Sequence, residues 1–232
     1  MDTRDYLLTM LQDRSVPVRY RMAKLLVCTH DFQLAVNKQE LFSWETIRAR
    51  HEQSGFSSAF RKKISDRCFP DMDRVDLMKQ IWKTIVPKLE VLSPDWTVFL
   101  KDTLISLYHS CPEETSYMEL LLDFQDTFPE WQVQKEQLLV YWLYTYFCGA
   151  VYDEKIFAKG KMAVICTLFI EELVLGLYAR KREKPEPGEL VSVCYRFSRE
   201  LEHSDQNLNM LEELLDQEEI FSLEHLMTLC SI

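Results

Sequence analysis

The side chains best suited to binding or catalysis gather near the end of the chain, in residues 195–207, YRFSRELEHSDQN. Apolar residues in and around this stretch recur at helical spacing and predict a helix with one buried stripe. The polar residues beside the stripe are short, varied and able to form hydrogen bonds, whereas a solvated helix face is usually rich in Lys and Glu. Arg196, Glu200 and His203 stand at i, i+4 and i+7, so we expect them to share a face where partial desolvation strengthens their hydrogen bonds.

Two interpretations of this cluster stay open. In the first, it binds a substrate or a partner and lies against the buried helix that contains Tyr141 and Tyr144. In the second, Ser204 and Asp205 end one helix and start another, and the neighbouring polar groups lock the junction. The candidate binding residues of the first interpretation are Tyr141, Tyr144, Arg196, Glu200, Glu202, His203, Asp205 and Asn207. No catalytic residue is assigned.

The same cluster has one feature of a metal site, because Glu200 and His203 have the i, i+3 spacing found in carboxylate-bridged di-metal bundles. Such a centre requires the same pair on a second helix. The residues three positions before the remaining histidines are Val27, Arg48, Ser106 and Ser222. The second pair is therefore missing, and we predict no metal site.

The seven cysteines are too far apart for a local metal site, because the nearest two, Cys148 and Cys166, are eighteen positions apart. Cys68 and Cys111 precede proline-containing breaks and lack the flanking pattern of a nucleophile. The others lie in apolar helical stretches and are expected to be buried, unreactive thiols: Cys28, Cys148, Cys166, Cys194 and Cys230. The odd count and the absence of a secretory signal predict a cytoplasmic protein.

The composition predicts an acidic and helical protein. Of the 232 residues, 47% are apolar, and only 5 are Gly and 8 are Pro, so the chain can bury a sizeable core and has long segments between helix breakers. The net charge of -10 disfavours nucleic acid and anionic membranes as partners. The most apolar window, Met162–Ile170, is too short to span a bilayer, so no membrane partner is predicted.

These patterns predict an all-α fold, a compact multi-helix bundle of roughly ten to twelve helices. We expect a single helical domain over residues 1–232. It could divide near residue 70 and at a short linker, 180–188. The apolar runs 138–147 and 162–175 are expected at its centre, because they are apolar almost all round.

Caps and breakers predict where individual helices begin and end. Ser93-Pro94-Asp95 is typical of a helix start. Two separate helices are expected over residues 17–28 and 30–37. A further helix is expected over 189–216, with a kink near Ser204.

Several stretches of the chain resemble one protein family. They are KEQLLVYWLYTYFCGAVYD at 135–153, KMAVICT at 161–167, the polar stretch at 195–207, and LQDR at 11–14 with Pro17 and Arg19–Arg21. Together they are similar to the C-terminal half of the bacterial flagellin lysine N-methylase family. The likeness extends over most of the chain and is strongest from Lys135 to Asn207.

The resemblance implies an S-adenosylmethionine-dependent transfer of methyl groups to lysines of a surface protein. Family members also carry an N-terminal cysteine-rich region suited to an iron–sulfur centre, and this sequence has no counterpart to it. We therefore expect a fragment or a short relative, and no cofactor in this chain itself. Thr145 stands where the family often has Arg, and Glu154 stands where Gly usually follows the Asp.

The sequence is compatible with three functions. The favoured one is a helical module that holds a protein substrate, such as a flagellin, or the missing cysteine-rich domain. The second is an unrelated helical adaptor that binds a protein through its acidic surface. The third is an active S-adenosylmethionine-dependent protein-lysine N-methyltransferase.

Overall fold

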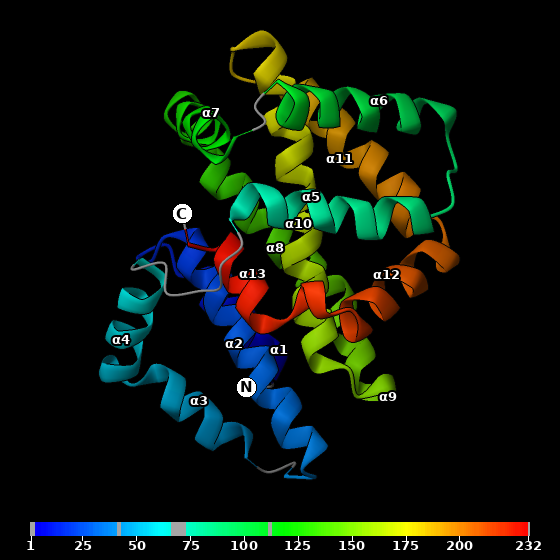
Figure 1. Ribbon diagram of the computed structural model, residues 1–232. Helices are drawn as coiled ribbons and strands as arrows, with labels where there is room; N and C mark the ends of the chain where they lie inside the picture. The colour runs from blue at the N-terminus through cyan, green and yellow to red at the C-terminus, as the bar shows by residue number, and fades with distance from the viewer. Residues whose placement is uncertain (1–2, 41–42, 66–72, 111–112, 232) are drawn as a thin grey trace. The chain divides into compact units, whose positions relative to one another are not determined.

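A computed structural model describes residues 3–40, 43–65, 73–110 and 113–231 of the chain (Figure 1). Within them every regular element is a helix, which confirms the all-α class. The α-helices are α1 (Thr3–Leu11), α2 (Val18–Asn37), α3 (Trp44–Glu52), α4 (Ser54–Ser65), α5 (Arg74–Ile85), α6 (Pro94–Leu104), α7 (Glu114–Thr127), α8 (Trp131–Tyr146), α9 (Ala150–Asp153), α10 (Ile156–Lys181), α11 (Pro187–Glu202), α12 (Asp205–Gln217) and α13 (Leu223–Leu229). Short 3₁₀ turns lie at Val86–Lys88, Phe147–Gly149 and Glu219–Phe221.

The contacts of the chain group into two compact units. Unit 1 comprises residues 1–72, 132–165 and 215–232, and unit 2 comprises residues 73–131 and 166–214. Helices α8, α10 and α12 contribute residues to both units. The single domain over the whole chain stays a prediction.

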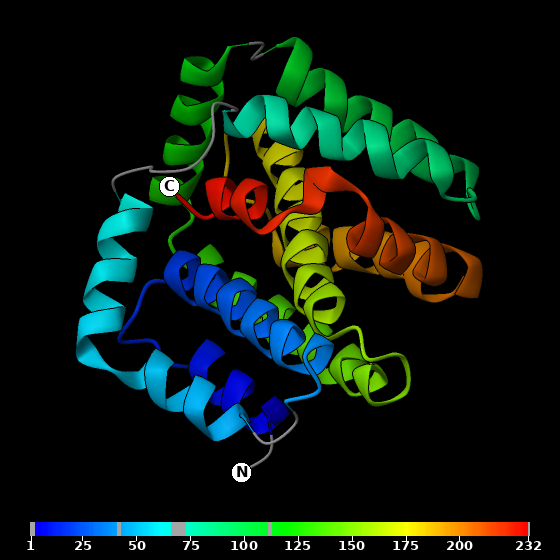
Figure 2. The same ribbon diagram turned by 60° about the horizontal axis from the view of Figure 1, so that its bottom comes forward.

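Unit 1 is organised around α2, which packs against α1, α3 and α13. Figure 2 shows α1 and α2 side by side. The two separate helices predicted over 17–28 and 30–37 were wrong, because α2 continues from Val18 to Asn37. The residue at the expected break, Thr29, is fully buried, and its hydroxyl donates a hydrogen bond to the Leu25 carbonyl at 2.8 Å. The polar group is thereby satisfied inside the helix and does not end it.

A buried carboxylate near the start of α8 joins this helix to α2 and to the connection between α1 and α2. Glu136 is 2% exposed and accepts hydrogen bonds from Arg14 Nη2 at 2.8 Å and from Arg21 Nη1 at 2.6 Å. The hydrogen bond from Arg14, together with Arg21, lowers the pKa of Glu136 despite its burial. The LQDR segment therefore fixes the chain between α1 and α2 by charge pairing.

Unit 2 contains a second buried charge network on α10. Glu171 accepts hydrogen bonds from Trp131 Nε1 at 3.0 Å and from Arg74 Nη2 at 3.3 Å. Glu172 accepts a hydrogen bond from the Tyr108 hydroxyl at 2.6 Å and another from the Tyr117 hydroxyl. Burial raises the pKa of Glu172. Both carboxylates are satisfied by protein donors, as buried charges must be.

Tyr108 reaches Glu172 from a π-helical turn, Ile105–His109, that follows α6. In this turn the Ser110 N–H donates to the Ile105 carbonyl at 3.1 Å, five residues back. The π turn accommodates one residue more than an α-helical turn would.

The longest helix, α10, has 26 residues and an 18-residue window of mean hydropathy 1.9. It is therefore long and apolar enough to cross a membrane, so the expectation that its apolar run is too short was wrong. However, 89% of that window is buried inside the protein, as in a core helix. That the chain has no membrane partner stays a prediction.

Two glycines let α10 approach its neighbours closely. A Cβ placed on Gly160 would lie 2.9 Å from Thr29 Cβ of α2, within unit 1. A Cβ placed on Gly176 would lie 2.8 Å from Thr103 Cγ2 of α6, within unit 2. Either distance is too short for an ordinary contact, so glycine is required by packing at both positions.

A candidate binding groove between α6 and α11

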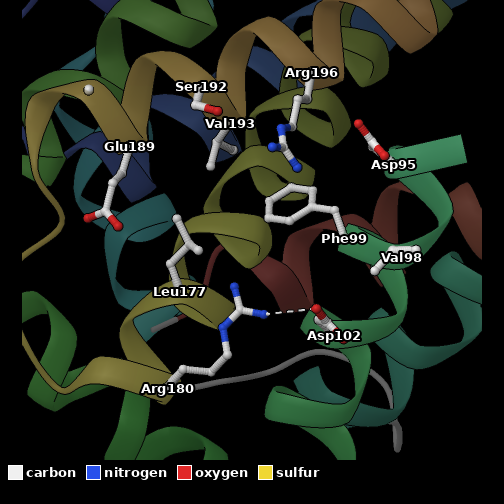
Figure 3. Close-up of a pocket in the computed structure, with 11 residues that line it drawn as sticks. Asp95, Val98, Phe99, Asp102, Leu177, Arg180, Glu189, Ser192, Val193 and Arg196 are labelled. Carbon is white, nitrogen blue, oxygen red and sulfur yellow. Dashed lines mark ion pairs between the residues drawn. The ribbon is translucent and has the colours of Figure 1, made fainter. Parts of the chain in front are cut away.

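An open groove of about 750 Å³ lies within unit 2 (Figure 3). Its walls are α6 and α11, and the C-terminal end of α10 contributes Leu177 and Arg180. Each wall presents four groove residues at i, i+3, i+4 and i+7, which is one helix face about two turns long. These residues are Asp95, Val98, Phe99 and Asp102 on α6, and Glu189, Ser192, Val193 and Arg196 on α11.

Local sequence signals fix where both walls begin. The α6 helix starts with Pro94 in its first turn, as the Ser93-Pro94-Asp95 signature predicted. The α11 helix starts with Pro187 after a capping box, in which the side chains of Glu186 and Glu189 accept hydrogen bonds from each other's backbone N–H groups. The groove wall is therefore anchored at the end where the chain enters it.

Most of the charges in the groove already have partners. Arg180 Nη1 lies 3.9 Å from Asp102 Oδ2, and Lys181 pairs with Glu189. The hydrogen bond from Lys181 lowers the pKa of Glu189. These pairs leave Asp95 and Arg196 as the charged groove residues without an ion-pair partner in the described chain.

Arg196 and Asp95 differ in their surroundings. The guanidinium of Arg196 is half-buried and lies over the Phe99 ring, 5.2 Å from its centroid. Figure 3 shows it directed into the groove. Asp95 is exposed to solvent in the first turn of α6, where the helix dipole favours a negative charge.

Of the eight predicted binding residues, Arg196 lines this groove. Glu200 and Asn207 instead hold the connection between α5 and α6. The Asn207 side chain accepts a hydrogen bond from Glu90 N–H at 2.8 Å and donates to the Glu90 carbonyl at 3.0 Å. A carboxylate oxygen of Glu200 accepts a hydrogen bond from Leu92 N–H at 2.7 Å. Ser204 adds a hydrogen bond to the Glu90 carboxylate.

The three polar residues predicted to share a face therefore have separate environments. Arg196 contacts Phe99, Glu200 contacts the backbone of the α5–α6 connection, and His203 is exposed where α11 ends. Within the described residues, no hydrogen bond joins them to one another. The predicted kink near Ser204 is a break between α11 and α12.

The remaining predicted residues are exposed or half-buried and lie outside the groove. Glu202 is half-buried and accepts a hydrogen bond from Ser198, and Asp205 is exposed in the first turn of α12. Tyr141 and Tyr144 belong to unit 1, and their exposed fractions are 47% and 61%. The α8 helix therefore has an exposed aromatic face, and the expectation that the apolar run 138–147 lies at the centre of the fold was wrong for these two residues.

The cysteines were expected to be buried thiols. This is confirmed for Cys28, Cys166 and Cys230, whereas Cys148 is exposed and Cys194 is half-buried. Burial raises the pKa of the Cys28 thiol to about 12, so it is inert at neutral pH. Cys68 and Cys111 lie outside the described residues.

One family matches almost the whole chain. The FliB lysine N-methylase C-terminal domain family matches residues 4–229. The chain belongs to this family. No curated protein and no solved structure matches it.

The cofactors implied by the family resemblance can be tested against this FliB C-terminal domain. Its described residues contain no group of three His, Cys, Asp or Glu side chains able to hold a metal. An iron–sulfur cluster is held by several cysteine thiolates that lie together, and the described cysteines form no such group. In the groove, Phe99 is 8% exposed and lies under Arg196, so it offers no open face on which an adenine could stack.

The α6 wall of the groove in this FliB domain was not predicted from the sequence. A signal was present, because Asp95 and Asp102 flank Val98 and Phe99 at i, i+3, i+4 and i+7. That pattern gives an apolar face with a charge at each end. It is also typical of an ordinary solvated helix, so only the position of α11 opposite identifies it as a wall.

Proposed function

We propose that this FliB domain is a helical module for protein lysine methylation, and that its α6–α11 groove holds a segment of a protein. The favoured segment belongs to a flagellin-like substrate or to a cysteine-rich domain of the same system. The observation that carries the proposal is the groove itself, which combines an apolar floor with charged walls. Binding sites for side chains of a partner have this composition.

The family supplies the second support. Its name describes a lysine N-methylase, and methyl transfer to a protein requires that the protein be held while its lysine reacts. The described residues form a groove that could hold a protein segment. The buried carboxylates Glu136, Glu171 and Glu172 instead accept hydrogen bonds from side chains of the protein itself. The proposed role is therefore positioning of a protein.

Gly188 offers a direct test because it lines the groove. A Cβ at this position meets nothing within 4 Å, so a larger side chain can be added to the lining of the groove without a clash at its Cβ. The matched control is Gly55, which is also the second residue of a helix and also has nothing within 4 Å of a Cβ. It lies in α4 of unit 1, outside the groove.

Purified flagellin and a purified cysteine-rich domain of the family are titrated with wild type, Gly188→Leu and Gly55→Leu by calorimetry. We expect one of the two proteins to bind wild type and Gly55→Leu equally, and to bind Gly188→Leu at least about tenfold more weakly. Equal binding by all three variants would exclude the groove as the binding site. Binding of neither protein would contradict the proposed function.

The third function, methyl transfer by this chain alone, has its own measurement. Incubation of the protein with S-adenosylmethionine and flagellin, followed by mass spectrometry of flagellin lysines, detects it. The proposed positioning role predicts no methylated lysine above a control without the protein. Methylation of flagellin lysines by the purified chain would contradict the positioning role and show that the chain is itself a methyltransferase.

A further inference from the structure

We infer that the α6–α11 groove accepts an amphipathic helix that carries a carboxylate beside its apolar face, and that Arg196 receives this carboxylate. The inference rests on the proposed function, since it concerns the same groove. It specifies the conformation and the charge of the bound segment.

The walls of the groove favour a helix over an extended strand. Both walls are α-helices, whose backbone N–H and C=O groups are used within the helix, so no sheet edge is available to pair with an extended chain. Each wall exposes a face at i, i+3, i+4 and i+7. A helix laid between two such faces offers apolar side chains at the same spacing, about two turns long.

Apolar groups in the groove are incompletely covered. Val98 is 60% exposed, and Leu177 is half-buried although most of α10 around it is buried. Val193 and Phe99 lie deeper, with exposed fractions of 2% and 8%. A bound helix would remove the outer two side chains from water, and the hydrophobic effect favours that burial.

The charge of the bound helix follows from Arg196. Its guanidinium has lost part of its hydration against Phe99 but has no carboxylate partner in the described chain. A half-buried cation gains most from an added carboxylate, because the local dielectric is low and the hydration already lost is replaced. The planar group can stay on the ring and still donate from its edge.

A basic segment would gain less from this groove. Asp102 and Glu189 are already paired with Arg180 and Lys181. Asp95 is exposed, so water and the start of α6 already stabilise its charge. An incoming lysine would therefore either replace an existing cationic partner or pair with a solvated carboxylate. Exposed ion pairs of this kind contribute little to the free energy of binding.

The test is a selection among amphipathic helices displayed on phage, with the residues beside the apolar stripe randomised. Binders to the wild-type protein are selected after removal of phage that bind Gly188→Leu. We expect the retained helices to share an Asp or Glu next to the apolar stripe. Retained helices that carry Lys or Arg there, or no charge, would overturn the inference, as would a selection that retains no helix.

The strongest retained helix is then measured in a double-mutant cycle by fluorescence anisotropy. Replacing its acidic residue by the amide, or making Arg196→Gln, should each weaken binding about tenfold, and the two changes together should weaken it little further. Arg199→Gln is the control, because Arg199 lies one turn further along α11 and outside the groove. Independent effects of the two changes would show that the carboxylate binds elsewhere.

Two other outcomes separate this inference from the proposed function. If Gly188→Leu abolishes flagellin or cysteine-rich domain binding while Arg196→Gln leaves it unchanged, the groove is the site and the carboxylate assignment is wrong. If sedimentation shows a dimer that Gly188→Leu dissociates, the occupant is a second copy of the chain, and the inference of a separate acidic helix is wrong.

Discussion

Asn207 and Arg196 are both polar residues beside the buried stripe of one predicted helix, yet they have different surroundings in the structure. Asn207 is fully buried, and both ends of its amide bind the backbone of Glu90. Arg196 is half-buried at an open groove. A polar residue near a helix junction can therefore stabilise the fold or face a ligand, and its partners decide which.

Asn207→Ala should lower stability without changing partner binding per folded molecule. The substitution leaves the Glu90 N–H and carbonyl without their side-chain partner, which should cost about 2 to 3 kcal/mol in the free energy of unfolding. Urea denaturation measures the loss. Asn209→Ala on the exposed side of the same helix is the control and should change little. Equal stabilities of the two variants would contradict the assigned role.

Arg14→Gln should make unit 1 more sensitive to acid. Arg14 lowers the pKa of Glu136 through its hydrogen bonds, so the folded state holds this carboxylate ionised at a lower pH than the unfolded state does. The resulting stability is present above the unfolded pKa and is lost as the pH falls through the folded pKa. The variant lacks part of this stability at every pH above the unfolded pKa, so it should unfold at a higher pH than wild type, measured by circular dichroism during acid titration. Arg19→Gln, whose partner is the Tyr20 ring, should leave the acid midpoint where it is in wild type.

The sequence indicates which side chains can form hydrogen bonds but not which groups they bind. Short polar residues around Ser204 predicted both a binding role and a locked junction. The structure assigns Glu200 and Asn207 to contacts with residues 90 and 92, more than a hundred positions earlier in the chain. Hydrogen bonds over such separations depend on how helices pack, which residue type alone does not encode.

The helical class and most helix starts could be predicted from local signals in the sequence. Ser93-Pro94-Asp95 marked the start of α6, and Ser204 marked the break before α12. The continuity of α2 through Thr29 could not be predicted in this way, because the polar group there is satisfied by the preceding turn. The groove could not be predicted from local signals either, because it is formed by two helices, α6 and α11, that face each other (Figure 3).

Gly160→Ala should destabilise the protein although alanine favours helices. The new Cβ would lie 2.9 Å from Thr29 Cβ, between α10 and α2, and overpacking of this kind costs about 1 to 3 kcal/mol. Gly188→Ala is the control in open space, where the better helix propensity should leave stability unchanged or raise it by less than about 1 kcal/mol. Thermal unfolding of the two variants compares them. A Gly160→Ala variant as stable as wild type would mean that α2 and α10 are not in contact there.

Three helices, α8, α10 and α12, contribute residues to both compact units. If one half of such a helix unfolds, the other half gains a new end with unpaired backbone groups, and this makes unfolding of the two halves cooperative. We therefore expect one cooperative unfolding transition, as the prediction of a single domain implies. Sequence patterns cannot decide this point, because they describe each helix separately.

Gly160→Ala in unit 1 and Asn207→Ala in unit 2 test that cooperativity. Each variant should move the entire transition seen by far-UV circular dichroism to a lower denaturant concentration. The tryptophan fluorescence transition should move with it. Two separate transitions, with each variant moving only one of them, would show that the units unfold independently.

The π-helical turn at Ile105–His109 also limits where the chain can change length. Deleting one residue there would leave a regular α-helix with its backbone hydrogen bonds intact. Everything after the deletion would rotate by about 100° relative to α6, so Tyr108 would no longer point at Glu172, the buried carboxylate that accepts its hydrogen bond. Relatives of this chain should therefore tolerate insertions and deletions in the connections around α6 but keep the spacing from Phe99 in the groove to Tyr108.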